Sequence, residues 1–198
     1  NNVAIGFTAG QLMTSGIRNT IIGSLSGDAL TTGGQNTFIG FNSGGATTDQ
    51  SFNVAVGDSA LGTNVNGARN VAIGNSALGT MNPASDTDTY NVAIGYDAGN
   101  AVTTGTANTI IGGLAGSALT TGIDNAVLGY NALSTEDTGS RSVAIGREAL
   151  RDQNFDGSAY NVGIGYQAGL SVTASIQNVL IGGFAGDAIT TGGGNVAI

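Results

Sequence analysis

One five-residue phrase, Asn-Val/Thr-x-Ile-Gly, recurs along the whole chain and restricts what it can fold into. Nine of the eleven spacings between its twelve copies are 17 residues, and the other two are 21 and 19 residues. Such regularity indicates a stack of equivalent units. A second phrase, x-x-Ala/Ser-Gly/Leu, follows most copies, and a polar turn, often Thr-Thr-Gly, comes next. The leading residues of the copies are Asn2, Asn19, Asn36, Asn53, Asn70, Asn91, Asn108, Asn125, Ser142, Asn161, Asn178 and Asn195.

The length of the repeat selects the kind of unit. Seventeen residues are too few for a helix pair, which takes about 34 residues. A helix is also disfavoured because each interior Gly would cost about 1 kcal/mol. The unit fits one coil of a solenoid, with short strands rich in Val, Thr and Ile and with turns that contain Gly. The sequence therefore predicts an all-β fold, a parallel β-solenoid (β-roll) of about twelve 17-residue coils. Residues 1–198 form a single repeat array, with loop inserts near 84–90 and 152–160.

The pattern within the phrase makes a prediction about partners. The Ile position is never polar, so we expect it to face the core of the coil together with the Val/Thr position two residues earlier. The residue between them should then face outward, yet it is also never polar, as Ala4, Phe38 and Val127 illustrate. A strand that is apolar on both faces is buried on both. We therefore expect copies of this chain to cover that face in a homo-oligomer around a shared axis.

The phrase-leading Asn has two possible roles. Stacked Asn side chains can form a ladder of amide hydrogen bonds from coil to coil. Exposed Asn could instead bind a sugar. The ladder is the preferred interpretation.

Composition excludes several classes of function. The net charge is −8, with 13 acidic residues against five Arg, so nucleic acid and anionic membrane surfaces are not expected partners. No run of 18 apolar residues occurs, so this segment is not expected to insert into a membrane. The absence of His, Cys and Lys removes the usual nucleophile–base pairs. We predict that the chain is not an enzyme and has no catalytic, cofactor or metal site.

Acidic clusters offer the alternatives to that prediction. Glycosidases need two carboxylates, and Asp86 with Asp88, or Glu136 with Asp137, could supply them. Nothing else converges on these residues, so solvated turns are the preferred interpretation. The stretch 152–157 (DQNFDG) matches the first half of an EF-hand calcium loop, but Gly163 stands where the closing Glu belongs. The calcium hypothesis stays open. Ice binding is disfavoured, because it needs Thr-x-Thr on every coil and here the Thr residues are adjacent.

Residues that flank the phrase suggest surface contacts. Arg residues directly precede the leading residue at Arg18, Arg69 and Arg141, and we expect them to pair with acidic residues of adjacent coils. Aromatic residues follow the phrase Gly, and this recurrence predicts packing at a coil corner, with sugar stacking as the alternative. Those aromatic residues are Tyr96, Tyr130 and Tyr166, with Phe7 and Phe41.

The repeated phrase resembles a known family. NVAIG followed by AG or AL is similar to the NSVAIG head repeats of trimeric autotransporter adhesins, which have a 14-residue unit. It is still more similar to the NTAIGYNAG…TTG repeats of phage tail-fibre-like proteins, and the resemblance covers essentially the whole chain. It implies three parallel chains, hence a homotrimer, and a fibre on a virion or cell surface. This chain departs from the adhesin heads in its 17-residue period.

The expected function is mechanical. The resemblance and the solenoid together predict a shaft segment of an extracellular fibre that holds a distal receptor-binding element away from the particle. Neither end of the sequence has a polar cap, which solenoids require, so we expect a fragment of a longer fibre. A bacterial surface adhesin or filament whose sides bind matrix, a glycan or a protein receptor is the alternative. A β-helix enzyme that acts on polysaccharide is a more distant one.

Overall fold

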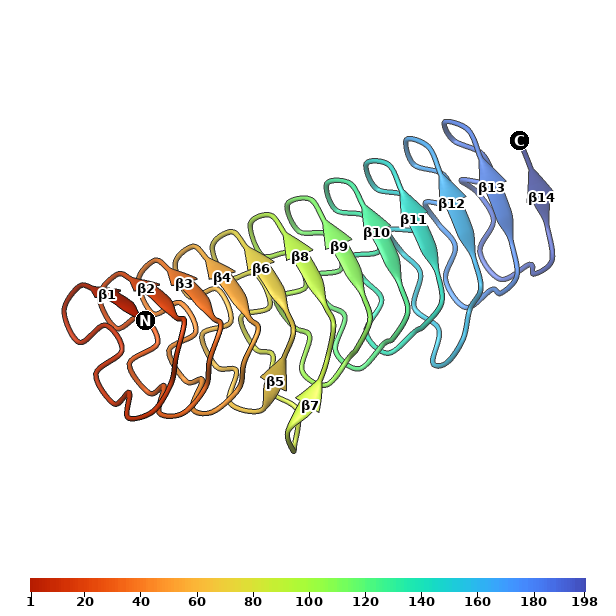
Figure 1. Ribbon diagram of the computed structural model, residues 1–198. Coiled ribbons are helices and arrows are strands. Elements are labelled where there is room, and N and C mark those ends of the chain that lie inside the picture. The colour runs from red at the N-terminus through yellow and green to blue at the C-terminus, as the bar shows by residue number, and fades with distance from the viewer.

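A computed structural model describes residues 1–198 as a parallel β-solenoid of about eleven turns (Figure 1). Twelve strands form one sheet in chain order along one side of the rod, and the termini lie at opposite ends. The predicted fold class is thereby confirmed. The strands are β1 (Val3–Ile5), β2 (Thr20–Ile22), β3 (Thr37–Ile39), β4 (Val54–Val56), β6 (Val71–Ile73), β8 (Val92–Ile94), β9 (Thr109–Ile111), β10 (Ala126–Leu128), β11 (Val143–Ile145), β12 (Val162–Ile164), β13 (Val179–Ile181) and β14 (Val196–Ala197).

Each phrase residue pairs with its counterpart one coil further on. Ile5 lies beside Ile22, and the same register continues across both longer spacings, from β6 to β8 and from β11 to β12. The extra residues lie in loops away from the sheet (Figure 1). A small second sheet, β5 (Gly67–Ala68) with β7 (Thr87–Asp88), borders the first insert, and a bridge between Ser140 and Ser158 borders the second.

The Gly that ends each phrase is required by the stacking distance. Gly112 has φ 131°, and a Cβ there would lie 2.5 Å from the carbonyl oxygen of Gly129 in the next coil. The backbones of adjacent coils therefore approach as closely as their hydrogen bonds demand, as in Gly112 N to Ile94 O at 2.7 Å. A side chain at this position would force two coils apart.

The two faces of the strands are the reverse of those predicted. The middle residue, expected to face outward, is buried in the coil interior at every strand from β2 to β13. The Val/Thr and Ile positions, expected to face the core, lie on the outer surface of the sheet and are half-buried or exposed. The inference that the strands are apolar on both faces stands for all but β2, β3 and β9, which carry Thr20, Thr37 and Thr109 on the outside, and the face left without cover is the Val/Thr–Ile face.

Matched volumes explain why the middle residue fits inside. Phe38 fills its coil because Gly44 stands opposite, where a Cβ would lie 2.7 Å from the ring. Between two neighbouring coils the match is similar, because Gly163 makes room for Leu150 of the preceding coil, whose Cγ lies 2.7 Å from where a Cβ would be. These side chains belong to one continuous core of 24 buried residues. The interior is narrow, so large residues are balanced by small ones in the same coil or in a neighbouring coil.

The predicted Asn ladder is confirmed. The backbone N–H of Asn108 donates to the Oδ1 of Asn91, one coil earlier, at 3.0 Å. Its side-chain Nδ2 donates to the same oxygen at 3.1 Å and to Gly122 O at 2.8 Å. The phrase-leading Asn from Asn19 to Asn178 are fully or almost fully buried. They are therefore structural, and a sugar could not reach them.

Candidate functional site

The outer face of the sheet is the largest regular surface feature of the chain. Two rows of side chains, from the Val/Thr and the Ile positions, run along all twelve strands with no covering element. The Ile row contains no polar residue. We call this surface the outer face. Monomeric proteins rarely leave a continuous apolar surface of this kind uncovered.

Two columns of exposed residues flank the outer face. The upstream column consists of the residue directly before each phrase-leading Asn or Ser, and the downstream column of the residue directly after each phrase Gly. Every residue of the upstream column is exposed. The upstream column is Asn1, Arg18, Gln35, Phe52, Arg69, Tyr90, Ala107, Asp124, Arg141, Tyr160, Gln177 and Gly194; the downstream column is Phe7, Ser24, Phe41, Asp58, Asn75, Tyr96, Gly113, Tyr130, Arg147, Tyr166 and Gly183.

The predicted pairing of upstream arginines with acidic neighbours is confirmed at two of three positions. Arg69 contacts Asp88 at 2.9 Å, and Arg141 contacts Asp124 at 3.5 Å. Arg18 has no ion pair. Both pairs are about half exposed, so each contributes only about 0–1 kcal/mol to stability.

The aromatic residues after the phrase Gly do not pack into a coil corner, contrary to the prediction. Tyr96, Tyr130 and Tyr166 are all exposed on the surface. The turn that follows the phrase Gly projects them outward beside the outer face, since the space inside is already filled by the middle strand residue. They are thus available to a partner.

A buried polar network replaces the Asn ladder where Ser142 interrupts it. The Nε2 of Gln153 donates to Ser142 Oγ at 3.0 Å and to Glu136 Oε2 at 2.9 Å. Its Oε1 accepts from Asn161 Nδ2 at 2.8 Å. Glu136 is fully buried. Burial raises the pKa of its carboxyl, although hydrogen bonds from Gln153 and from backbone N–H groups lower it.

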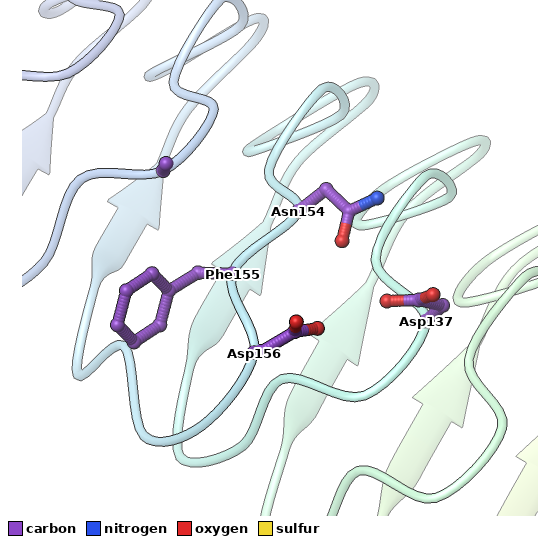
Figure 2. A pocket seen from close by; sticks show the side chains of 5 residues that line it. Asp137, Asn154, Phe155 and Asp156 are labelled. Carbon is purple, nitrogen blue, oxygen red and sulfur yellow. The ribbon is translucent and has the colours of Figure 1, made fainter.

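Beside this network lies an open surface depression of about 510 Å³. Figure 2 shows the carboxylates of Asp137 and Asp156 and the amide of Asn154 around it. Asp156 accepts a hydrogen bond from Thr138 Oγ1 at 2.7 Å, whereas the buried Oδ1 of Asp137 has no partner. Asp152 lies outside the depression, because Arg151 binds its carboxylate at 2.7 and 3.0 Å. Of the suggested calcium loop, Asn154 and Asp156 thus share the depression, whereas Asp152 does not join them.

The suggested carboxylate pairs are also divided between different partners. Asp86 accepts from Gln50 Nε2 at 2.9 Å, while Asp88 is held by Arg69 and by the hydroxyl of Tyr90 at 3.1 Å. Glu136 lies in the coil interior and its neighbour Asp137 lines the depression. No group of three or more His, Cys, Asp or Glu side chains is arranged to hold a metal ion.

The chain contains no helix of the length and apolarity needed to cross a membrane. Comparison with protein-family models, with curated proteins and with solved structures finds no match. The fold and its surface thus define the class, a parallel β-solenoid repeat protein with an uncovered apolar sheet face.

Proposed function

We propose that this chain is a shaft segment of a trimeric extracellular fibre, such as a phage tail fibre, and has no enzymatic role. The fibre holds a distal receptor-binding element away from the virion or cell. The observation that carries the proposal is the outer face, which runs the whole length of the rod and which one chain cannot bury. Three parallel copies around a common axis bury the outer face against one another. Because the copies are parallel, equivalent residues lie at equal heights, so the apolar rows of the three chains meet along their whole length.

The interior of the rod supports a mechanical role. Twelve strands at about 4.8 Å spacing give a length of roughly 50 Å. Each coil is fixed to the next through the sheet, through the Asn ladder and through turn hydrogen bonds such as Leu114 N to Tyr96 O at 2.8 Å. A rod whose coils are tied in three places, with the Gln153 network in place of the ladder at Ser142, keeps a constant length, which a spacer requires.

The mass of the native particle tests the proposal. We expect light scattering to give three times the 19.4 kDa chain mass. Ile94→Asp and Ile111→Asp place charges on the outer face and should yield folded single chains. Thr104→Asp, in an exposed turn, is the matched control and should stay trimeric. A monodisperse single-chain species of the unchanged protein at micromolar concentration would refute the fibre.

A further inference from the structure

The surface aromatic residues and the arginines are confined almost entirely to the two columns. Of the six Phe and five Tyr residues, eight lie in the columns, as do four of the five Arg. Phe184 directly follows the downstream column and packs edge-on against Tyr166, with ring centroids 5.1 Å apart. Aromatic residues and Arg are the residue types enriched in protein–protein interfaces. Their distribution therefore singles out the borders of the outer face.

Neighbouring coils hold these side chains in place. The guanidinium of Arg69 lies 4.5 Å from the centre of the Phe52 ring and 5.9 Å from that of Tyr90, and it also contacts Asp88. In the downstream column Arg147 lies 5.3 Å from the ring centre of Tyr130. Side chains that are already ordered lose less conformational freedom when a partner binds.

The upstream column combines a left-handed backbone with side chains that are mostly long and exposed. Its ten residues from Arg18 to Gln177 all have φ between 53° and 64°. Gly adopts this left-handed conformation without strain, whereas Arg, Phe and Tyr do not. Eight of these ten residues nevertheless have long side chains, and Ala107 and Asp124 are the exceptions. The same conformation recurs two residues after each phrase Gly and at buried leucines such as Leu61 and Leu133, so it belongs to the geometry of the coil. What distinguishes the upstream column is that its long side chains are exposed and lie on a border of the outer face, where a partner can contact them.

We propose that the upstream column of one copy packs against the downstream column of the next copy, so that the two columns form the seams of the fibre. This inference rests on the proposed function. When parallel copies form a ring with their outer faces toward a shared axis, the upstream column of one copy meets the downstream column of the next. Residues of the same coil then lie at the same height along the axis. Tyr90 then lies beside Tyr96 of the next copy, and Tyr160 beside Tyr166. Arg141 and Arg147 also share a height, and Asp124 and Glu148 neutralise them within each chain.

The surface has the size of a stable interface. The two columns are six residues apart along each strand and turn, which corresponds to about 20 Å. Over a rod of about 50 Å, the outer face with its columns covers on the order of 1,000 Å² per copy. A standard interface takes about 800 Å² from each partner. A sugar would need only one or two aromatic platforms and would not account for columns on both borders along the full rod.

Engineered cysteines test the seam, because the natural chain has no Cys. Tyr90 and Tyr96 are 56% and 59% exposed, so the double variant Y90C/Y96C leaves the core intact. The two positions of one chain are about 20 Å apart, too far for an internal disulfide. After oxidation or treatment with a short bismaleimide, we expect covalent dimers and trimers on a non-reducing gel.

The single variants Y90C and Y96C are the controls and should stay uncrosslinked, because like columns are kept apart. The pair Y160C/Y166C, four coils further on, should behave as Y90C/Y96C does. If the native particle is a trimer but the double variants do not crosslink, or the single variants crosslink equally well, the seam is wrong while the fibre stands. If the native protein is a single chain by light scattering, both proposals fail.

Discussion

Glu136 is the only acidic residue buried inside the rod. It stands in the column of interior residues that elsewhere holds Leu119 or Val172, and it lies there without a cation. Its carboxylate is tolerated because donors surround it, including Gly139 N at 2.8 Å and Gln153 Nε2 at 2.9 Å. The sequence alone indicates a solvated turn for Glu136. Neither the Ser at position 142, where other copies of the phrase have Asn, nor Gln153 indicates that these side chains meet Glu136 inside the coil.

The buried carboxyl predicts a pH dependence of stability. Because the pKa of Glu136 is raised, the folded chain keeps this proton to a higher pH than the unfolded chain does. Its contribution to the free energy of unfolding is therefore full below the ordinary glutamate pKa of about 4.3 and is lost as pH rises through the raised value. We expect the stability of the wild type relative to E136Q to fall with rising pH, as measured by urea unfolding.

Glu148 provides a contrast of opposite sign. A hydrogen bond from Gln167 lowers the pKa of its carboxyl, and Arg147 lowers it further. The stability of the wild type relative to E148Q should thus fall as pH is lowered. Parallel pH profiles for the wild type and E136Q would contradict the assignment of the buried carboxyl.

At the scale of the strand, hydrophobic pattern predicted the elements but not their orientation. Both alternate positions are apolar in most strands, with Thr20, Thr37 and Thr109 as the exceptions, so polarity alone could not decide which one faces inward. The deciding signal is volume. The middle position ranges from Gly163 to Phe38, and its size is compensated by a neighbour: Gly44, six places beyond Phe38, leaves room for the ring, and Leu150 of the preceding coil fills the space beside Gly163. A position whose size varies and is compensated by a neighbouring residue faces a confined interior. The Ile row is nearly uniform in size and shows no such compensation, so it does not face that interior.

The compensation between Leu150 and Gly163 can be measured. Leu150→Ala should cost about 2–5 kcal/mol through the cavity it leaves. Gly163→Ala should cost about 1–3 kcal/mol, because its Cβ would lie 2.7 Å from Leu150 Cγ. In the double variant the added methyl enters the cavity, so we expect a total at least about 1 kcal/mol below the sum.

Gly183→Ala is the matched control for that pair. A Cβ at Gly183 would meet only the carbonyl oxygen of Tyr166, at 4.0 Å, so its combination with Leu150→Ala should be additive in denaturant unfolding. Additivity of the Leu150 and Gly163 variants would show that the two sites do not share one space.

At the scale of the whole molecule, the period carried most of the information. Repeated phrases predicted the solenoid and the twelve strands of its main sheet, but not the small sheet of β5 and β7. The partners of the outer face could not be predicted in the same way, because a single sequence shows that a surface is apolar but not what covers it. Likewise the contacts around Asp137 depend on loop geometry between coils, which no periodic pattern encodes.

Equivalence of the coils predicts that one can be removed. Deletion of residues 108–124, a full 17-residue unit, joins Ala107 to Asn125 and restores the phrase. The shortened chain should fold with wild-type circular dichroism and lose roughly one coil interface of stability. Deletion of residues 108–123 shifts every later side chain relative to the preceding coils and should abolish cooperative unfolding. Equal behaviour of the two deletions would mean that the stack is not built from interchangeable coils.

The parallel sheet also gives the rod a characteristic response to force. Hydrogen bonds between strands run along the long axis, as where Gly23 N donates to Ile5 O at 2.8 Å. A pull on one end loads the bonds of a single coil at a time and opens them like a zipper, whereas compression presses all coils together. The rod therefore resists compression but unravels from an end under tension. Any attachment that carries tension must hold several coils at once.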